Sequence, residues 1–435
     1  MYTRKLLIPH QYYYPNMNFI EDRCTSAKKE KFFNKLDGLA NRKKATIYVH
    51  IPFCNSKCAF CSFDKEYNLD EMEAYVNKVV EELIFYSDKV GKIYQIQSIH
   101  FGGGTPTLLP AHLLQKIIDC IRDNFAIDED TAIDIEGSAT TIHRDDIIDL
   151  IKRNNITRVS FGVQSFDQRI RERMTMKATR EDVFHTLEVL GKNNIVSFID
   201  VLYGYPDFGI GDMKEIMVQD IKTAIEWNVG GIEFGQMYPF KNELEKIVRN
   251  NNLRRPGTAE IIDMIETGTE MMVNAGYTQT TYSGFVKDGK IILETSYFGG
   301  IEEMPDCIAC GSGAFGNLAG YKYRNGSYNI YMASETPCYS QLKEMSKEQI
   351  ENMQIVGFPK VLVLDKALMR NREITERFEN KFSALVRDKY VEDRGQFYML
   401  TPKGRNYIDN IYWDLLEDTE KENIEKYLSI YLLEA

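Results

Sequence analysis

Residues 46–61, TIYVHIPFCNSKCAFC, join a short apolar run to three cysteines in C-x3-C-x2-C spacing. The run TIYVHI is typical of a strand, because β-branched and aromatic residues favour extended backbone. Cys54, Cys58 and Cys61 come directly after it, at the end of a strand where parallel barrels place functional groups. A closed structural metal site normally has four ligands. Three cysteines therefore either recruit a fourth ligand from elsewhere or leave one metal position open.

Further apolar runs follow at intervals of about 25 to 50 residues, which leaves room for a crossover helix each time. The stretches 69–87 and 111–125 between them carry apolar residues at i, i+3, i+4 and i+7, the helical period. This alternation predicts an α/β fold with a parallel sheet and outer helices. We expect a partial (β/α)6 barrel, because no G-x-G-x-x-G motif opens the first helix as in a doubly wound sheet. The five further runs are SIHF (98–101), AIDIE (132–136), RVSFGV (158–163), SFIDVLY (197–203) and GIEFGQMY (231–238).

The pattern divides the chain into four parts: an N-terminal extension (1–45), the partial barrel (46–285), a connecting segment (286–345) and a helix-rich C-terminal domain (346–435). The connecting segment begins with a predicted hairpin around Lys287-Asp288-Gly289. In the C-terminal domain a helix, a hairpin turning at Asp393-Arg394-Gly395 and a further helix predict a winged-helix-like module. Its charges are too evenly mixed for a DNA-binding surface.

Composition narrows the class of protein. The chain has 435 residues, of which 43% are hydrophobic and 27% charged, as in ordinary globular proteins. The formal charge of −11 argues against broad nucleic-acid or anionic-membrane binding. We find neither a signal peptide nor an apolar stretch of the roughly 18 residues that a membrane span needs, so we expect a cytoplasmic protein. Eight cysteines in a chain of this length are not a disulfide framework.

Polar groups follow several of the predicted strands. FGGGTPTLL (101–109) comes after the second strand, and its glycines let backbone N–H groups approach a ligand without an intervening Cβ. Glu136, Gln164 and Asp200 are expected at the ends of the third, fourth and fifth strands. Each alone fits a structural role such as a helix cap equally well. Together with the cysteines at one rim, they predict an active site.

The cysteines suit either zinc or iron. Cys307 or Cys310 is available as a fourth zinc ligand, but a zinc knuckle needs neither the glycine loop nor the acidic residues at the rim. An iron–sulfur cluster held by three thiolates leaves one iron without a protein ligand, and a chelating cofactor can bind there.

The motifs resemble those of a known family. C-x3-C-x2-C within YVHIPFC, followed by GGGTP, is similar to the signature of radical S-adenosylmethionine (SAM) enzymes. With GVQSF and D-x-x-Y-G-x-P, the chain from about residue 46 onward resembles the branch containing the oxygen-independent coproporphyrinogen III oxidase. The resemblance implies a [4Fe–4S] cluster whose open iron binds SAM, and reductive cleavage of that SAM to methionine and a 5'-deoxyadenosyl radical.

The resemblance also implies two SAM molecules and their contacts. The oxidase pattern has an arginine twelve residues after the glutamine, where this chain has Met176, with Lys177 as a possible substitute. The cluster-bound SAM would contact Tyr48, Gly103, Glu136 and backbone near Phe315, and the second SAM would contact Phe60, Gly104, Thr105, Gln164 and Asp200.

Within the branch, the chain resembles most closely the anaerobic haem-degrading methyltransferases (anaerobilin synthases of the ChuW/HutW type). The oxidase usually has a fourth cysteine as C-x-C, where this chain has Cys61-Ser62-Phe63, and the haem-chaperone motif H-N-x-x-x-Y-W is absent. The likeness shows in RVSFGVQSFDQRIRERM (158–174), AEIIDMIETGTEMMVNAGY (259–277) and DCIACGSGAFGNLAGY (306–321). It implies methylation of a haem bridge, opening to a linear tetrapyrrole, loss of iron, and a flavodoxin- or ferredoxin-type electron donor. The alternatives are the coproporphyrinogen oxidase, a methyltransferase acting on another aromatic substrate, and a haem chaperone.

Several residues keep more than one interpretation. Cys307 and Cys310 fit a metal site, a redox pair or small residues in a tight loop, with Cys310 also a candidate hydrogen donor near substrate. Together with Gln164 and Asp200, Cys310 completes the candidate catalytic set. His10 is either a surface residue or an axial haem ligand. His50 and His100 are expected to order the cluster loop.

Overall fold

The computed structural model describes residues 2–8, 14–17, 21–40, 43–287, 305–369 and 372–431. All six predicted strands form, in chain order and side by side, and each pairs with the next in parallel. This consecutive order confirms the predicted α/β fold with a partial barrel. The strands are β1 (Lys43–Ile51), β2 (Tyr94–Gly103), β3 (Ala132–Gly137), β4 (Arg158–Gln164), β5 (Ser197–Tyr203) and β6 (Gly231–Gln236).

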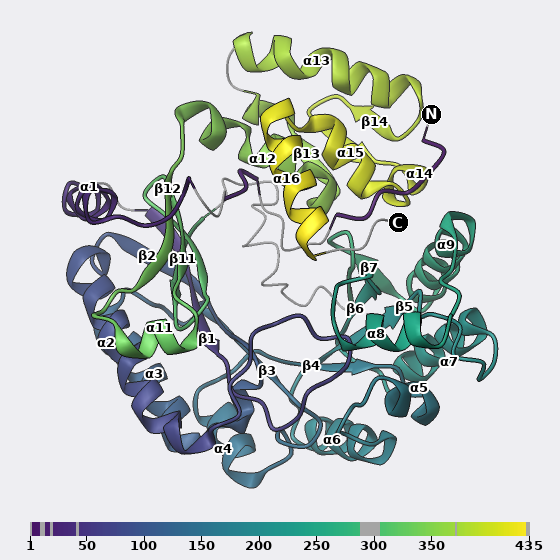
Figure 1. Cartoon of the computed structure of the whole chain (residues 1–435), viewed down its shortest axis with the longest axis horizontal. Helices are drawn as coiled ribbons and strands as arrows, with labels where there is room; N and C mark the ends of the chain where they lie inside the picture. Colours follow the sequence, from purple (N-terminus) through teal and green to yellow (C-terminus); the bar gives the residue numbers. More distant parts are fainter. Residues whose placement is uncertain are drawn as a thin grey trace.

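Helices connect these strands along the outside of the curved sheet (Figure 1). The two helical patterns read from the sequence form α2 and α3, within two or three residues of the expected limits. Local chemistry defines the ends of others: Thr179 and Asp182 form a reciprocal capping box at the start of α6. The helices are α2 (Met72–Val90), α3 (Ala111–Asn124), α4 (Asp145–Arg153), α5 (Gln168–Arg173), α6 (Arg180–Lys192), α7 (Met213–Glu226), α8 (Glu243–Asn250) and α9 (Thr258–Asn274).

The sheet extends beyond the six strands on both sides. Beside β6 lie β8 (Gly284–Lys287) and β7 (Tyr277–Gln279), which pair as an antiparallel hairpin. Residues 288–304 lie outside the described residues, so the hairpin predicted around Lys287-Asp288-Gly289 is described only as far as Lys287. On the other side, β9 pairs with β1 in parallel, and three antiparallel strands continue the sheet. These are β9 (Asp306–Cys310), β10 (Phe315–Leu318), β11 (Tyr321–Asn325) and β12 (Tyr339–Glu344), with α11 (Tyr328–Ala333) before β12.

The C-terminal region is helical with a small antiparallel sheet, and it lies over the open side of the barrel (Figure 1). The predicted hairpin at residues 393–395 forms between β14 and β15, and β13 adds a third strand. The elements are α12 (Lys347–Val361), β13 (Val363–Asp365), α13 (Arg372–Arg387), β14 (Val391–Arg394), β15 (Phe397–Leu400), α14 (Pro402–Arg405), α15 (Ile408–Leu415) and α16 (Asp418–Tyr431). The proposed boundaries between domains stay predictions.

The described N-terminal segments contact both the extended sheet and the C-terminal region. The Leu6 N–H donates to Asn410 Oδ1 (3.0 Å), and the Tyr14 hydroxyl donates to Glu417 (2.9 Å). Lys322 of β11 donates from Nζ to the Tyr14 carbonyl (3.0 Å). Helix α1 (Ser26–Asp37) follows and contacts α2 and β12.

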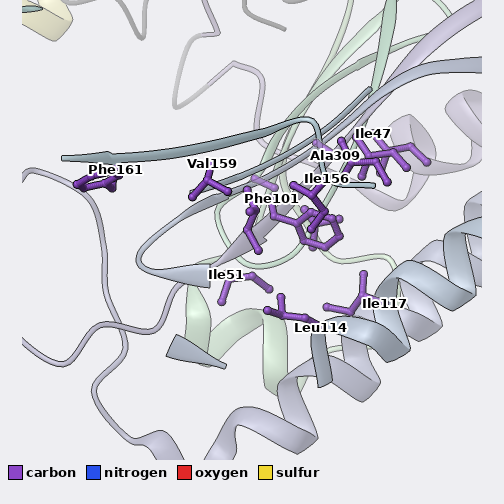
Figure 2. Close-up of a cluster of buried hydrophobic side chains, with 14 of the residues drawn as sticks. Ile47, Ile51, Phe101, Leu114, Ile117, Ile156, Val159, Phe161 and Ala309 are labelled. Carbon is purple, nitrogen blue, oxygen red and sulfur yellow. The ribbon is translucent and has the colours of Figure 1, made fainter. Parts of the chain in front are cut away.

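Alternation along the strands gives the barrel sheet two different faces. The outer face, under the helices, is apolar: Ile51 of β1 lies near Leu114 and Ile117 of α3 (Figure 2), and Ile47 of the same strand belongs to the same buried cluster. The inner face carries Tyr48 and the side chains on the same side of the neighbouring strands, and many of these are polar. Among the described residues, no helix is long and apolar enough to span a membrane.

Candidate active site

The three clustered cysteines lie in the loop that follows β1, as predicted. Several backbone hydrogen bonds hold this loop, including Cys54 N–H to the Glu66 carbonyl (3.0 Å) and Ala59 N–H to the Met174 carbonyl (2.9 Å). Cys54 Sγ lies 3.3 Å from Thr105 Oγ1, just after the glycine loop. All eight cysteines of the chain are free thiols. The loop therefore holds three free thiols on a backbone that is fixed by hydrogen bonds.

Lys65 supplies a positive charge beside these thiols. Burial lowers the pKa of Lys65, but Cys61 and Cys54 outweigh burial, and its pKa lies above the ordinary lysine value. Burial raises the pKa of the Cys58 thiol, and Lys65 opposes that rise. Thiolates are the metal-binding form of cysteine, and a nearby ammonium favours them. Lys65 therefore favours the thiolate form of these cysteines, the form that a metal would need.

Within the described part of the chain, no three His, Cys, Asp or Glu side chains converge on a point where one metal ion could bind. A four-iron cluster is larger than a single ion, so its three thiolate ligands need not converge on one point.

The glycine loop differs from the sequence expectation in one respect. Its N–H groups do not point to open space: Gly103 N–H donates to Glu136 Oε2 (3.0 Å) and Gly104 N–H to the Ile51 carbonyl (2.7 Å). The glycines are needed because neighbouring groups fill the space of a Cβ. A Cβ on Gly103, which has φ +112°, would lie 2.6 Å from the His50 ring. The loop makes room for two histidines and does not supply free donors.

Those histidines hold Tyr48 between them. The Tyr48 ring stacks on His100 with a centroid distance of 5.6 Å, and its hydroxyl lies 2.8 Å from His50 Nδ1. Burial lowers the pKa of His50 to about 4, so its Nδ1 can accept from the Tyr48 hydroxyl at neutral pH. His100 Nε2 lies 3.2 Å from Glu136 Oε1. Tyr48, Gly103 and Glu136, the expected contacts of the first SAM, thus lie together.

Gln164 has an unusual backbone and side chain. It is a non-glycine residue with φ +64°, next to a register shift between β4 and β5. The side chain folds back over Gly162, since a Cβ there would lie 2.3 Å from Gln164 Nε2 and 3.7 Å from Asp200 Oδ2. Its Oε1 is buried and has no hydrogen-bond partner. Strained φ values and unsatisfied buried groups are costly, and they cluster at functional sites.

Asp200 requires a correction. We expected it at the end of the fifth strand, but it is the fourth of seven residues in β5 and pairs with Gly162 and Glu233. Alternation still places it on the inner face, close to Gln164. The two residues lie together, with Asp200 deeper in the barrel than Gln164.

Three other predicted SAM contacts, Phe60, Thr105 and Phe315, lie in or directly after the loops that follow β1, β2 and β9. The Thr105 N–H donates to the Phe53 carbonyl (2.8 Å), and the half-buried Phe60 accepts from Asn242 Nδ2 through its carbonyl (2.8 Å). Phe315 begins β10, is 51% exposed, and lies under Arg324. Lys177 is exposed, without a hydrogen bond or ion pair to any described residue.

Cys310 lies apart from this group. Its register partner is Val49 of β1, so its side chain lies on the outer face, opposite Tyr48. It is fully buried, and burial raises the pKa of its thiol well above the ordinary value. Cys307 pairs with Thr46 and lies on the inner face. His10 is outside the described residues.

Sequence reasoning missed four charged residues that support the site. Arg171 is fully buried and donates to the carbonyls of Val163 (2.6 Å), Ser165 (2.9 Å) and Ala178, which fixes the loop after Gln164. No local signal marks it in the sequence, because it lies between Ile170 and Glu172 in a helix with several charged residues. Lys65 was recognisable as a cation close to the cysteines. The other two are Asp134 and Arg158.

Comparisons with known proteins agree with this geometry. A family model described as the Radical SAM superfamily matches residues 48–218. An anaerobilin synthase of Escherichia coli O157:H7 is 30% identical over 293 residues, 66% of this chain and 64% of that protein, slightly less than two thirds of its length. The heme chaperone HemW of Lactococcus lactis subsp. lactis is 25% identical over 399 residues, 87% of this chain and 98% of that protein.

A solved structure shares the fold. The coproporphyrinogen III oxidase HemN from Escherichia coli, described as a radical SAM enzyme, superposes with a TM-score of 0.78 at 18% identity, covering 93% of this chain and 96% of that chain. A radical SAM domain implies a [4Fe–4S] cluster and SAM, and the three free thiols beside Lys65 fit such a cluster. The predicted resemblance is confirmed: the chain carries a radical SAM domain at residues 48–218, is similar in sequence to anaerobilin synthase and HemW, and shares the fold of HemN.

Proposed function

We propose that this enzyme degrades haem without oxygen, by transferring a SAM-derived carbon to a bridge of the porphyrin and opening the ring to a linear tetrapyrrole with release of iron. The 30% identity to an anaerobilin synthase supports this substrate class. So does the sequence, which lacks both the C-x-C cysteine of the oxidase and the late motif of the chaperone. A small flavodoxin or ferredoxin would supply electrons.

In this proposal Cys54, Cys58 and Cys61 hold a [4Fe–4S] cluster, which when bound supplies the electron for SAM cleavage. Glu136 binds the amino group of the first SAM, because a carboxylate held by Gly103 N–H and by His100 is a preorganised acceptor for an ammonium or amine. Tyr48, fixed between two imidazoles, covers one side of the same position.

The observation that carries the two-SAM proposal is the state of Gln164. Leaving a buried amide oxygen without a partner costs about 1–3 kcal/mol, and the left-handed backbone adds a similar cost. A second SAM that donates to Gln164 Oε1 would remove the first of these costs. Asp200 lies beside the same amide, and its carboxylate would offset the positive charge of that SAM. A methyl donor is needed there, because a SAM cleaved at the cluster releases its methyl group within methionine.

The test is an anaerobic incubation of the reconstituted enzyme with haem, reductant and methyl-deuterated SAM, followed by mass spectrometry. We expect a linear tetrapyrrole that carries deuterium, free iron, 5'-deoxyadenosine and S-adenosylhomocysteine. Cys58→Ala is the control and should leave haem intact. Unlabelled product, or intact haem after many equivalents of SAM, would exclude this reaction for the wild-type enzyme.

A haem chaperone is the second candidate, because the match to HemW covers 98% of that protein. A chaperone would bind haem and release it unchanged to an acceptor, without stoichiometric SAM consumption. Recovery of intact haem on an apo-haemoprotein, together with no 5'-deoxyadenosine above background, would favour this function.

A further inference from the structure

A chain of four charged side chains crosses the inner face of the barrel. Arg158 Nε donates to Asp134 Oδ1 (2.7 Å), and Asp134 Oδ2 bonds to His100 Nδ1. His100 Nε2 lies 3.2 Å from Glu136 Oε1, and Glu136 Oε2 accepts from Gly103 N–H (3.0 Å). The chain therefore runs from a buried guanidinium to the carboxylate at the rim.

The charges along this chain are well defined. Burial raises the pKa of Asp134, but Arg158 and His100 outweigh burial and hold it below the ordinary aspartate value. Burial lowers the pKa of His100, but Asp134 and then Glu136 outweigh burial and raise it to about 10. At neutral pH His100 is then an imidazolium, with one N–H for Asp134 and one for Glu136. The formal charges therefore alternate from Arg158 through Asp134 and His100 to Glu136, and they sum to zero.

Both oxygens of Glu136 are therefore held, one by His100 and one by the Gly103 backbone. The Glu136 side chain is still 39% exposed, whereas Asp134 is fully buried. Glu136 thus keeps lone pairs available to a ligand, while His100 and the Gly103 N–H fix the orientation of its carboxylate.

We propose that His100 is a positioning residue for SAM: fixed by Asp134 and Arg158, it orients the Glu136 carboxylate that receives the amino group of the cluster-bound SAM. The inference rests on the role proposed for Glu136, but it requires neither haem nor methyl transfer. Tyr48, stacked on the same imidazole, is held by His100 too.

The first test measures SAM binding to the reconstituted holoprotein in the absence of haem. We expect His100→Gln to keep its iron and sulfide content and to bind SAM roughly 10- to 100-fold more weakly, the usual loss when a supporting residue is removed. The matched control is His143→Gln, since His143 bonds to the Ala139 carbonyl (3.0 Å) and Thr186 (3.2 Å), outside the site. Wild-type affinity in His100→Gln would overturn the proposal.

The second test separates charge from packing. Asp134→Asn should lower the pKa of His100, so the ratio of variant to wild-type Kd should rise between about pH 6 and pH 9 as His100 loses its proton. The groups that face His100 are Asp134, Glu136, Tyr48, His50 and, through Asp134, Arg158. A ratio that is constant with pH would show a packing role only and would overturn the proposal.

A third measurement holds even if Asp134→Asn fails to fold. In wild-type holoprotein labelled with 15N-histidine, six side chains contribute signals, and the His100 signal is the one missing from His100→Gln. We expect both of its ring nitrogens to be protonated at about pH 8.5, where an ordinary histidine is neutral. A neutral imidazole at that pH would contradict the proposal. Weak SAM binding by His100→Gln with no haem product from the wild type would instead contradict the proposed function alone.

Discussion

Two carboxylates are fully buried on opposite faces of the same sheet, and the groups that surround them differ in charge. Asp134, on the inner face, lies between the cations Arg158 and His100. Glu82 of α2, on the outer face, accepts from the Gly311 N–H (2.9 Å), the Asn325 amide (2.8 Å) and the Tyr331 hydroxyl (2.7 Å), all neutral donors. Asp134 has a pKa below its ordinary value, whereas burial raises that of Glu82 to about 7.

The difference shows how the two faces divide their roles. Ionised groups are costly to bury and are kept only where cations compensate them. On the inner face, buried charges are compensated within a series of linked side chains. The series ends at Glu136, a partly exposed carboxylate that can interact with a ligand. The outer face holds its polar groups close to neutrality and uses them to join α2 to the loop after β9. The inner face carries the residues proposed to bind ligands, and the outer face packs against the helices.

The largest expected effect compares thiols at the rim and on the outer face. Cys58→Ala should abolish the iron–sulfur cluster, because three thiolates are the minimum for a cluster with one open iron. Cys310→Ala should keep it, because the Cys310 side chain lies on the opposite face from Tyr48. Iron and sulfide analysis with absorbance spectra measures both. A cluster that survives Cys58→Ala but not Cys310→Ala would contradict the assignment of the cluster to the thiols at the rim.

Asp134→Asn should lower the free energy of unfolding by about 3–5 kcal/mol at neutral pH, because it leaves a buried guanidinium without its counter-ion. Asp134 has a lowered pKa in the folded state, so its contribution is present above the ordinary aspartate pKa and is lost as the pH falls through the folded value. Urea unfolding at pH 7 measures the effect. The double variant Asp134→Asn/Arg158→Met should recover part of the loss, and a loss below about 1 kcal/mol would show that the pair carries little stability.

Glu82→Gln should behave in the opposite way with pH. The folded pKa of about 7 lies above the ordinary value of 4.5, so ionisation is penalised in the folded state. Wild-type stability should therefore fall as the pH rises from about 4.5 to 7, by about 3 kcal/mol, and stay level above that. Relative to wild type, Glu82→Gln should gain about that amount between pH 5 and pH 8 in urea unfolding. An equal difference at both pH values would mean that Glu82 is ionised like Asp134.

Structural features that depend on the periodicity of apolar residues or on the local spacing of motif residues can be predicted from the sequence. All six strands, helices α2 and α3 and the hairpin at 393–395 follow from apolar periodicity and turn residues, and the cysteine loop follows from its spacing. Partners far apart in sequence are harder to predict. His100 and Asp134 are 34 residues apart and Glu82 and Gly311 are 229 apart, and neither pair has a local signal. The depth of Asp200 in β5 and the outer-face position of Cys310 depend on strand limits and register, which no motif specifies.

Asp200→Ala probes the second ligand position of the inner face. It should keep the cluster and still form 5'-deoxyadenosine, while product labelled from methyl-deuterated SAM falls roughly 10- to 100-fold, because the methyl donor loses its positioning. The matched control is Asp207→Ala, an exposed residue after the same strand whose side chain accepts from Gly209 N–H (2.9 Å). Normal labelled product from Asp200→Ala would contradict the proposed role of this residue.

The smallest effect is expected at Lys177, the position next to the arginine of the oxidase pattern. Its side chain is exposed and bonds to no described residue, whereas Met176 before it is half-buried against the apolar cluster that includes Phe60. A solvated ammonium is screened by salt over about 10 Å and contributes at most about 1 kcal/mol. Lys177→Gln should therefore change the formation of labelled product by no more than about fivefold, with the remaining effect disappearing at high salt. Steady-state rates at two ionic strengths measure this, with Lys177→Arg as the charge-conserving control. A loss above about 30-fold that Lys177→Arg restores would show that Lys177 supplies the missing positive charge to the second SAM.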